Sequence, residues 1–129
     1  MAIKKSSGFD GGGLDPSVKV WYGTDNADTF NGGDGPVYAF GMGGNDVMIG
    51  NGGTDTLNGG QGSDSVYGGD GADRIFGDDP FEKPENNGAD FLFGGSGDDL
   101  IYAGGRDDIL YGGADIDVLY GDDGRDRVY

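Results

Sequence analysis

The stretch GGQGSDSVYGGDGADRIF, residues 59–76, consists of two consecutive nine-residue units that share one pattern. Both units have glycine at positions one, two and four, aspartate at position six and an apolar residue at position eight. The same register extends in both directions, with units that begin at residues 23, 32, 41, 50, 59, 68, 77, 94, 103, 112 and 121. A short repeat of this kind predicts a solenoid, because one unit cannot bury its apolar side chain without its neighbours.

Position eight is apolar in every unit, which predicts one inward-facing side chain in a three-residue strand. The residues at this position are Phe30, Ala39, Met48, Leu57, Val66, Ile75, Leu92, Ile101, Leu110, Leu119 and Val128. Glycine earlier in each unit permits a sharp turn, since it adopts positive φ without a steric penalty. We therefore expect an all-β chain folded as a flattened solenoid, with two units per coil, two thin parallel sheets and the position-eight side chains stacked between them.

Position six carries aspartate in every unit except the second, where Val37 replaces it. These aspartates are Asp28, Asp46, Asp55, Asp64, Asp73, Asp90, Asp99, Asp108, Asp117 and Asp126. With two units per coil, they divide between the two edges of the solenoid. One edge then presents Asp28, Asp46, Asp64, Asp90, Asp108 and Asp126, and the other presents Val37, Asp55, Asp73, Asp99 and Asp117.

Composition restricts the chemistry that these turns can perform. The 129 residues suit one domain, and 31 glycines leave too few apolar side chains for an ordinary core. The chain has no cysteine or histidine, so a metal would have to be bound through oxygen. Its net charge of -16 disfavours nucleic acid and anionic membranes as partners, and no apolar run is long enough for membrane insertion. Calcium, which takes six to eight oxygen ligands in adaptable geometry, suits the pattern better than magnesium.

The repeat resembles GGxGxDxUx, the pattern of the RTX (repeats-in-toxin) nonapeptide family, from Gly23 to Tyr129. The resemblance implies a parallel β-roll, a right-handed β-solenoid with two nine-residue repeats per coil. It also implies Ca²⁺ between the turns of successive coils, held by position-six aspartates and turn carbonyls. In the units that match best, those carbonyls belong to Gly59, Gly62, Gly68, Gly71, Gly94, Gly97, Gly121 and Gly124. Adjacent aspartate pairs number five on one edge and three on the other, which allows about eight ions.

The resemblance also implies a secreted, extracellular protein that leaves the cell unfolded by type I secretion. Calcium sites of extracellular modules often have dissociation constants of about 10⁻⁴ to 10⁻³ M, well above cytosolic calcium. We therefore expect the chain to fold on binding Ca²⁺ after export, since apolar burial alone offsets too little of the conformational entropy.

Several segments depart from the pattern. Residues 1–22 precede the repeats, and residues 14–22 alternate like a strand in which Trp21 would cap the first coil. Val37 beside Pro36 weakens the site shared with Asp55. An insertion at about residues 78–87 is interpreted as a solvated loop, although Asp78, Asp79, Glu82 and Glu85 offer a further site. No comparable cap follows Val128, so we expect either a piece of a longer array or self-association through the C-terminal end.

Two functions remain open beside calcium binding with a structural or interaction role. The chain is a module of a larger secreted enzyme or toxin, or it is an adhesion solenoid; catalysis of its own is not expected, because no nucleophile, base and cleft come together. The aromatic residues at position nine suit either carbohydrate or assembly contacts, or simple packing between strands. They are Tyr67, Phe76, Phe93, Tyr102, Tyr111, Tyr120 and Tyr129.

Overall fold

The computed structural model describes residues 17–81 and 83–129, which form twelve short strands and one turn of 3₁₀ helix. The strands are β1 (Lys19–Tyr22), β2 (Thr29–Gly33), β3 (Val37–Phe40), β4 (Val47–Gly52), β5 (Thr56–Asn58), β6 (Ser65–Asp70), β7 (Arg74–Phe76), β8 (Phe91–Ser96), β9 (Leu100–Gly105), β10 (Ile109–Ala114), β11 (Val118–Asp123) and β12 (Arg127–Val128). The helix η1 (Pro84–Asn86) lies in the insertion. No helix in the described ranges is long and apolar enough to cross a membrane.

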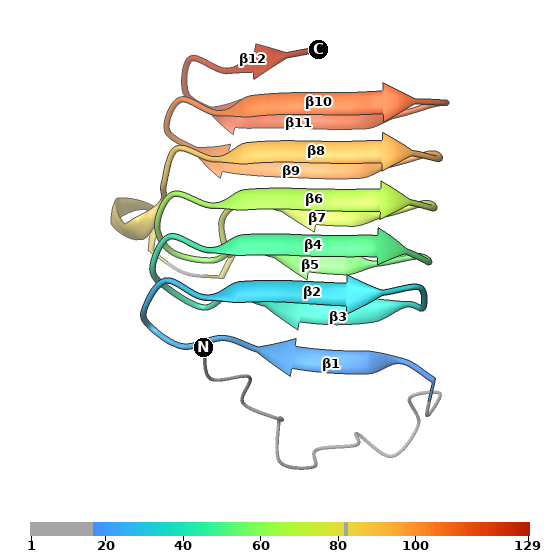
Figure 1. Ribbon diagram of the computed structural model, residues 1–129. Coiled ribbons are helices and arrows are strands. Elements are labelled where there is room, and N and C mark those ends of the chain that lie inside the picture. Colours follow the sequence, from blue (N-terminus) through green and yellow to red (C-terminus); the bar gives the residue numbers. More distant parts are fainter. Residues whose placement is uncertain (1–16, 82) are drawn as a thin grey trace.

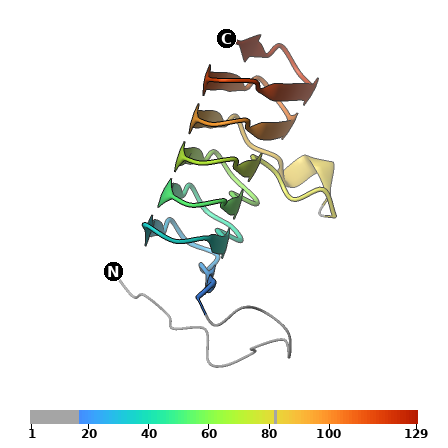
Figure 2. The same cartoon turned by 90° about the vertical axis from the view of Figure 1, so that its right-hand side faces the viewer.

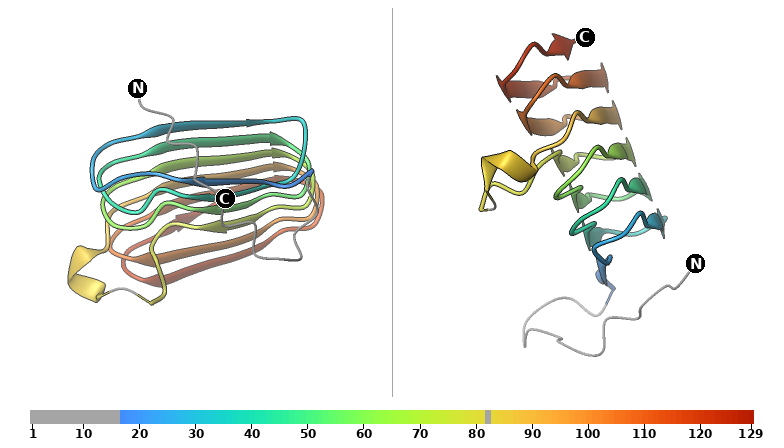
Figure 3. Two further views of the ribbon diagram at one scale, coloured as in Figure 1. Left: turned by 90° about the horizontal axis from the view of Figure 1, so that it is seen from below. Right: turned by 90° about the vertical axis from the view of Figure 1, so that its left-hand side faces the viewer.

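The strands alternate between two parallel six-stranded sheets. Sheet A has the order β1-β3-β5-β7-β9-β11, and sheet B has the order β12-β10-β8-β6-β4-β2. The chain passes from one sheet to the other at each turn and climbs in a right-handed sense, one strand per sheet in every coil (Figure 1). Viewed along the axis, each coil is a flattened loop (Figure 3, left). The predicted parallel β-roll is confirmed.

The core is a single column of position-eight side chains between the sheets. Each strand pairs with the strands two units before and after it in the sequence. In sheet B, Met48 therefore aligns with Phe30 and with Val66. In sheet A, Leu57 aligns with Ala39 and Ile75. Nine of the eleven position-eight side chains are buried: Phe30, Ala39, Met48, Leu57, Val66, Ile75, Leu92, Ile101 and Leu110. Val37 and Ala103 also belong to the core.

Many strands are longer than the three residues predicted. Strands β4, β6, β8, β9, β10 and β11 each have six residues and continue into the first glycines of the next unit. Pairing persists there because these glycines carry no side chain between neighbouring backbones; Gly113, for example, aligns with Gly95. Each turn is therefore tighter than the sequence suggested.

Positive φ recurs at positions two and four of the units. Gly69 and Gly71 have φ values of 114° and 125°, and Asn51 and Arg106 adopt φ values of 77° and 88° at the same two positions of other units. Glycine at position one has a different role: because it has no Cβ atom, a carboxylate oxygen and a backbone carbonyl oxygen can come close to its backbone.

The two ends of the solenoid differ. The ring of Trp21 in β1 is 6% exposed and lies 4.9 Å from the ring of Phe30, so it covers the first coil. At the other end Leu119 is only partly buried and Val128 is 50% exposed. Residues 14–16 of the predicted cap strand lie outside the described residues.

Candidate metal-binding edges

The turns form two edges of the solenoid. Edge 1 consists of the turns that precede the strands of sheet B, and edge 2 of the turns that precede β3, β5, β7, β9 and β11 of sheet A. Edge 2 faces the viewer in Figure 2, and edge 1, with the insertion, faces the viewer in the right panel of Figure 3. Position-six residues occur on the two edges as the repeat register predicted.

One carboxylate oxygen of each position-six aspartate from Asp46 onward ties two coils together. Oδ1 accepts a hydrogen bond from the backbone N–H of the position-six residue in the preceding coil, as Asp46 Oδ1 does from Asp28 at 2.8 Å. Nine such bonds, of 2.7 to 3.0 Å, run along the edges. On edge 1 they bridge the insertion, since Asp90 Oδ1 accepts from Asp64.

The second carboxylate oxygen has no protein partner. Seven Oδ2 atoms are buried without a hydrogen bond, those of Asp46, Asp55, Asp64, Asp73, Asp90, Asp99 and Asp108. A buried, unsatisfied carboxylate oxygen is strongly unfavourable, and coordination of a cation is one of the few arrangements that relieves it.

Glycine at position one leaves room for this oxygen. A Cβ atom on Gly68 would collide with Asp73 Oδ2 and would lie 2.6 Å from the carbonyl oxygen of Gly94 in the next coil. Gly50 repeats the arrangement with Asp55 Oδ2 and the Gly68 carbonyl. Carboxylate and carbonyl oxygens thus converge on the same space, which is the donor set that calcium prefers.

Of the glycines predicted as carbonyl ligands, Gly59, Gly62, Gly71, Gly97 and Gly124 lie in these turns. The other three, Gly68, Gly94 and Gly121, lie near the ends of strands β6, β8 and β11, next to the turns. Five of the predicted carbonyl oxygens, those of Gly59, Gly62, Gly68, Gly71 and Gly94, lie against the equivalent glycine of an adjacent coil. Gly97 and Gly124 have positive φ at position four, and Gly121 packs against Asp126 Oδ2. The residues present therefore fit a calcium ion between coils.

Burial sets the ionisation of the carboxylates. It raises the pKa of Asp46, Asp73 and Asp99 to about 6, of Asp64 and Asp108 to about 7, and of Asp90 to about 8, although the backbone hydrogen bonds act in the opposite direction. Burial also raises the pKa of Asp55. Negative charge in these turns is therefore unfavourable by itself and becomes favourable beside a divalent cation.

The second unit carries Val37 at position six, where the other units carry aspartate. Val37 donates its N–H to Asp55 Oδ1 at 3.0 Å, as an aspartate would. Its Cγ1 atom, however, lies 3.2 Å from the Cβ position of Gly32, where other units place Oδ2. A methyl group thus fills the turn, and the coil stacking continues without this carboxylate.

The insertion is tied to edge 1 by Asp78, which is 6% exposed. Its Oδ1 accepts from Gly88 N–H at 3.0 Å and its Oδ2 from Gly105 N–H at 2.8 Å. Asp79 Oδ1 accepts from Phe81 N–H, and Glu82 lies outside the described residues. Within the described ranges no three acidic side chains gather as a metal cluster, so the carbonyls are essential to any site.

Sequence reasoning missed a second ladder of hydrogen bonds at position five. Asn45, Asp98 and Asp107 each accept from the position-five N–H of the following coil, at 3.0 to 3.1 Å. Small polar residues at this position were the available signal, but they also suit exposed turns.

Together the coil geometry and the inward-facing carboxylates define a calcium-binding β-roll. A profile of the RTX calcium-binding nonapeptide repeat matches residues 22–57, 49–79, 86–119 and 102–129, most of the chain, and the chain belongs to that family. No curated protein and no solved structure matches it.

Proposed function

We propose that the chain is an extracellular calcium-binding module whose folding is driven by the ions bound along its two edges. The observation that carries the proposal is the set of seven buried Oδ2 atoms without a hydrogen-bond partner. The negative charge of these buried carboxylates destabilises the metal-free fold, whereas in the calcium-loaded fold the same charge attracts the divalent cation. About eight ions are expected, from the five and three adjacent aspartate pairs.

Export by type I secretion fits this coupling. Free calcium in a cytosol is far below the dissociation constants, about 10⁻⁴ to 10⁻³ M, that extracellular modules often show. The chain would therefore stay unfolded during export and fold outside the cell, in a structural or interaction role within a larger secreted enzyme or toxin. We assign it no catalysis of its own.

Calcium titration of the full chain tests the proposal. Circular dichroism is expected to change from disordered to β-rich as calcium is added to chelated protein, while calorimetry counts the ions. A β-rich spectrum that persists unchanged in excess chelator at neutral pH would refute the coupling.

Association through the end that exposes Val128 (50%) is a second, separate proposal. Unpaired parallel strand edges recruit further strands, and the partly exposed core there adds apolar area. Light scattering on the calcium-loaded chain tests it, and a concentration-independent monomer would reject it.

A further inference from the structure

A column of position-nine side chains runs along the outer face of sheet A and is interrupted once. The strand register aligns Tyr22, Phe40, Asn58, Phe76, Tyr102 and Tyr120. Neighbouring rings stack nearly parallel: Tyr22 on Phe40 at 5.2 Å, Phe76 on Tyr102 at 5.4 Å and Tyr102 on Tyr120 at 4.8 Å between centroids. Cross-strand packing therefore uses most of the ring faces, and Asn58 is the exception.

The interruption forms a slot between two aromatic rings. One face of Phe40 packs on Tyr22 and one face of Phe76 packs on Tyr102, so the remaining faces border the row of Asn58. Two strand spacings separate Phe40 from Phe76, about 9 to 10 Å. The slot is a cavity of about 210 Å³ that Thr56, Asn58 and residues 79–81 also line.

The slot offers two hydrogen-bond acceptor groups, the amide of Asn58 and the carboxylate of Asp79. Asn58 Oδ1 is buried and has no hydrogen-bond partner. The Asp79 carboxylate stands at the rim and accepts from Phe81 N–H through Oδ1, at 2.9 Å. Of the described residues that line the slot, none is basic. A ligand that fits must therefore supply hydroxyl or amine donors.

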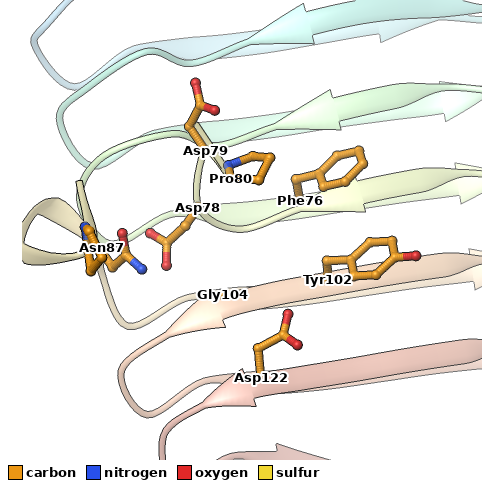
Figure 4. A pocket seen from close by; sticks show the side chains of 9 residues that line it. Phe76, Asp78, Asp79, Pro80, Asn87, Tyr102, Gly104 and Asp122 are labelled. Atoms are coloured by element: carbon orange, nitrogen blue, oxygen red, sulfur yellow. The ribbon is translucent and has the colours of Figure 1, made fainter. Parts of the chain in front are cut away.

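A second cavity continues the slot along the column. It has a volume of about 360 Å³ and shares Phe76, Asp79 and Pro80 with the slot. The ring of Tyr102 and the carboxylate of Asp122 line its far side (Figure 4). The combined groove has room for more than one ring of an extended ligand.

We propose that this groove binds a neutral saccharide, with one pyranose ring held in the slot between Phe40 and Phe76. The C–H groups on the two faces of a pyranose pack against aromatic rings, while its equatorial hydroxyls reach the Asp79 carboxylate and, once the Asn58 side chain rotates toward the slot, the Asn58 amide oxygen. A flat aromatic ring in contact on both faces needs only about 7 to 8 Å, less than the slot provides, and offers few donors. Acidic sugars are disfavoured by Asp79 and by the net charge of -16.

Phe81 provides a further contact at the mouth of the slot. Its side chain is 94% exposed although it lines the cavity. An exposed large aromatic side chain beside a groove is a common anchor for a ligand. The ring is available to pack on a bound sugar without disturbing the core.

Calorimetry on the calcium-loaded full chain tests the proposal with cellohexaose, maltohexaose and xylohexaose as probes and hexagalacturonate as the charged comparison. At least one neutral probe is expected to bind, and the charged probe at least tenfold more weakly. The variant N58Y completes the aromatic column, so it should raise the melting temperature and lose at least tenfold in saccharide affinity. F81A should weaken binding severalfold without changing the melting temperature.

The matched control is N31Y, which places the same side chain at position nine on sheet B and should bind like the parent. Calcium stoichiometry and circular dichroism are measured on every variant, so a failure of calcium-driven folding is recognised separately. No binding by a folded, calcium-loaded parent, equal binding by N58Y, or tighter binding of hexagalacturonate would each overturn the proposal.

Discussion

Protons and calcium should compete for the same carboxylates, so the metal-free chain should fold better in acid than at neutral pH. Burial raises the pKa of Asp90 from 3.8 to about 8 and that of Asp64 to about 7. Ionising Asp90 in the folded, metal-free chain is then about 6 kcal/mol less favourable than in the unfolded chain, and ionising Asp64 about 4 kcal/mol less favourable. These are upper figures, since local relaxation and water entry reduce them.

The sign follows from proton linkage. Between pH 3.8 and the raised pKa the folded chain binds more protons than the unfolded chain. The free energy of unfolding therefore falls as pH rises, with the stability present below pH 3.8 and lost by about pH 8 for Asp90. With calcium present the dependence reverses, because protonation displaces the ion.

The assay is circular dichroism of protein freed of calcium on a chelating resin, recorded from about pH 4 to about pH 8. We expect β-structure at the acid end and its loss toward neutral pH, and recovery at neutral pH when calcium is added. D90N is the matched variant: its amide oxygen still accepts from Asp64 N–H, so metal-free stability at neutral pH should rise while calcium stoichiometry falls. A metal-free chain that loses structure on acidification would refute the reasoning.

Three further substitutions test separate features of the turns. V37D supplies the missing carboxylate of edge 2 and should add one calcium ion by calorimetry; an unchanged count would show that the turn needs more than the side chain. G68A should lower the free energy of unfolding by about 1 to 3 kcal/mol in thermal melts. The control G35A, whose Cβ would meet nothing within 4 Å, should be nearly neutral in the same melts. Equal losses in the two variants would contradict the argument that position-one glycine permits close approach. D78A removes two charge-assisted hydrogen bonds and should lower the free energy of unfolding by about 3 kcal/mol. Proteolysis of the insertion should also become faster. If D78A has no larger effect than the control D79A, Asp78 does not hold the loop.

The fold and the grouping of the turn aspartates were predictable from sequence because the repeat has one period. A unit of nine residues with two units per coil makes each strand pair with the strand two units away, as Met48 does with Phe30 and Val66. Position eight then has to face inward, and position six has to lie in a turn. Even the exception at Val37 was visible as a missing carboxylate.

Contacts between coils were not predictable in the same way. Period alone does not say that Oδ1 of each position-six aspartate from Asp46 onward accepts from a backbone N–H, or that Oδ2 of seven of them is buried without a partner, because the sequence does not distinguish the two oxygens of one carboxylate. The role of Asp78 depends on Gly88 and Gly105, which the insertion brings together outside the repeat register.

The sequence by itself determined the solenoid, its two edges and the oxygen ligands of a calcium-binding repeat, since these follow from the local pattern and from the kinds of residue present. Only the tertiary structure decided which oxygens lack partners, how Asp78 anchors the insertion and that Asn58 opens a slot between Phe40 and Phe76. Most of these contacts join residues far apart in the sequence, such as the hydrogen bonds from Asp46 to Asp64, 18 positions away, and from Gly105 to Asp78, 27 positions away. Which atoms are buried and which hydrogen-bond partners they find depends on how neighbouring coils stack, so only the tertiary structure shows it.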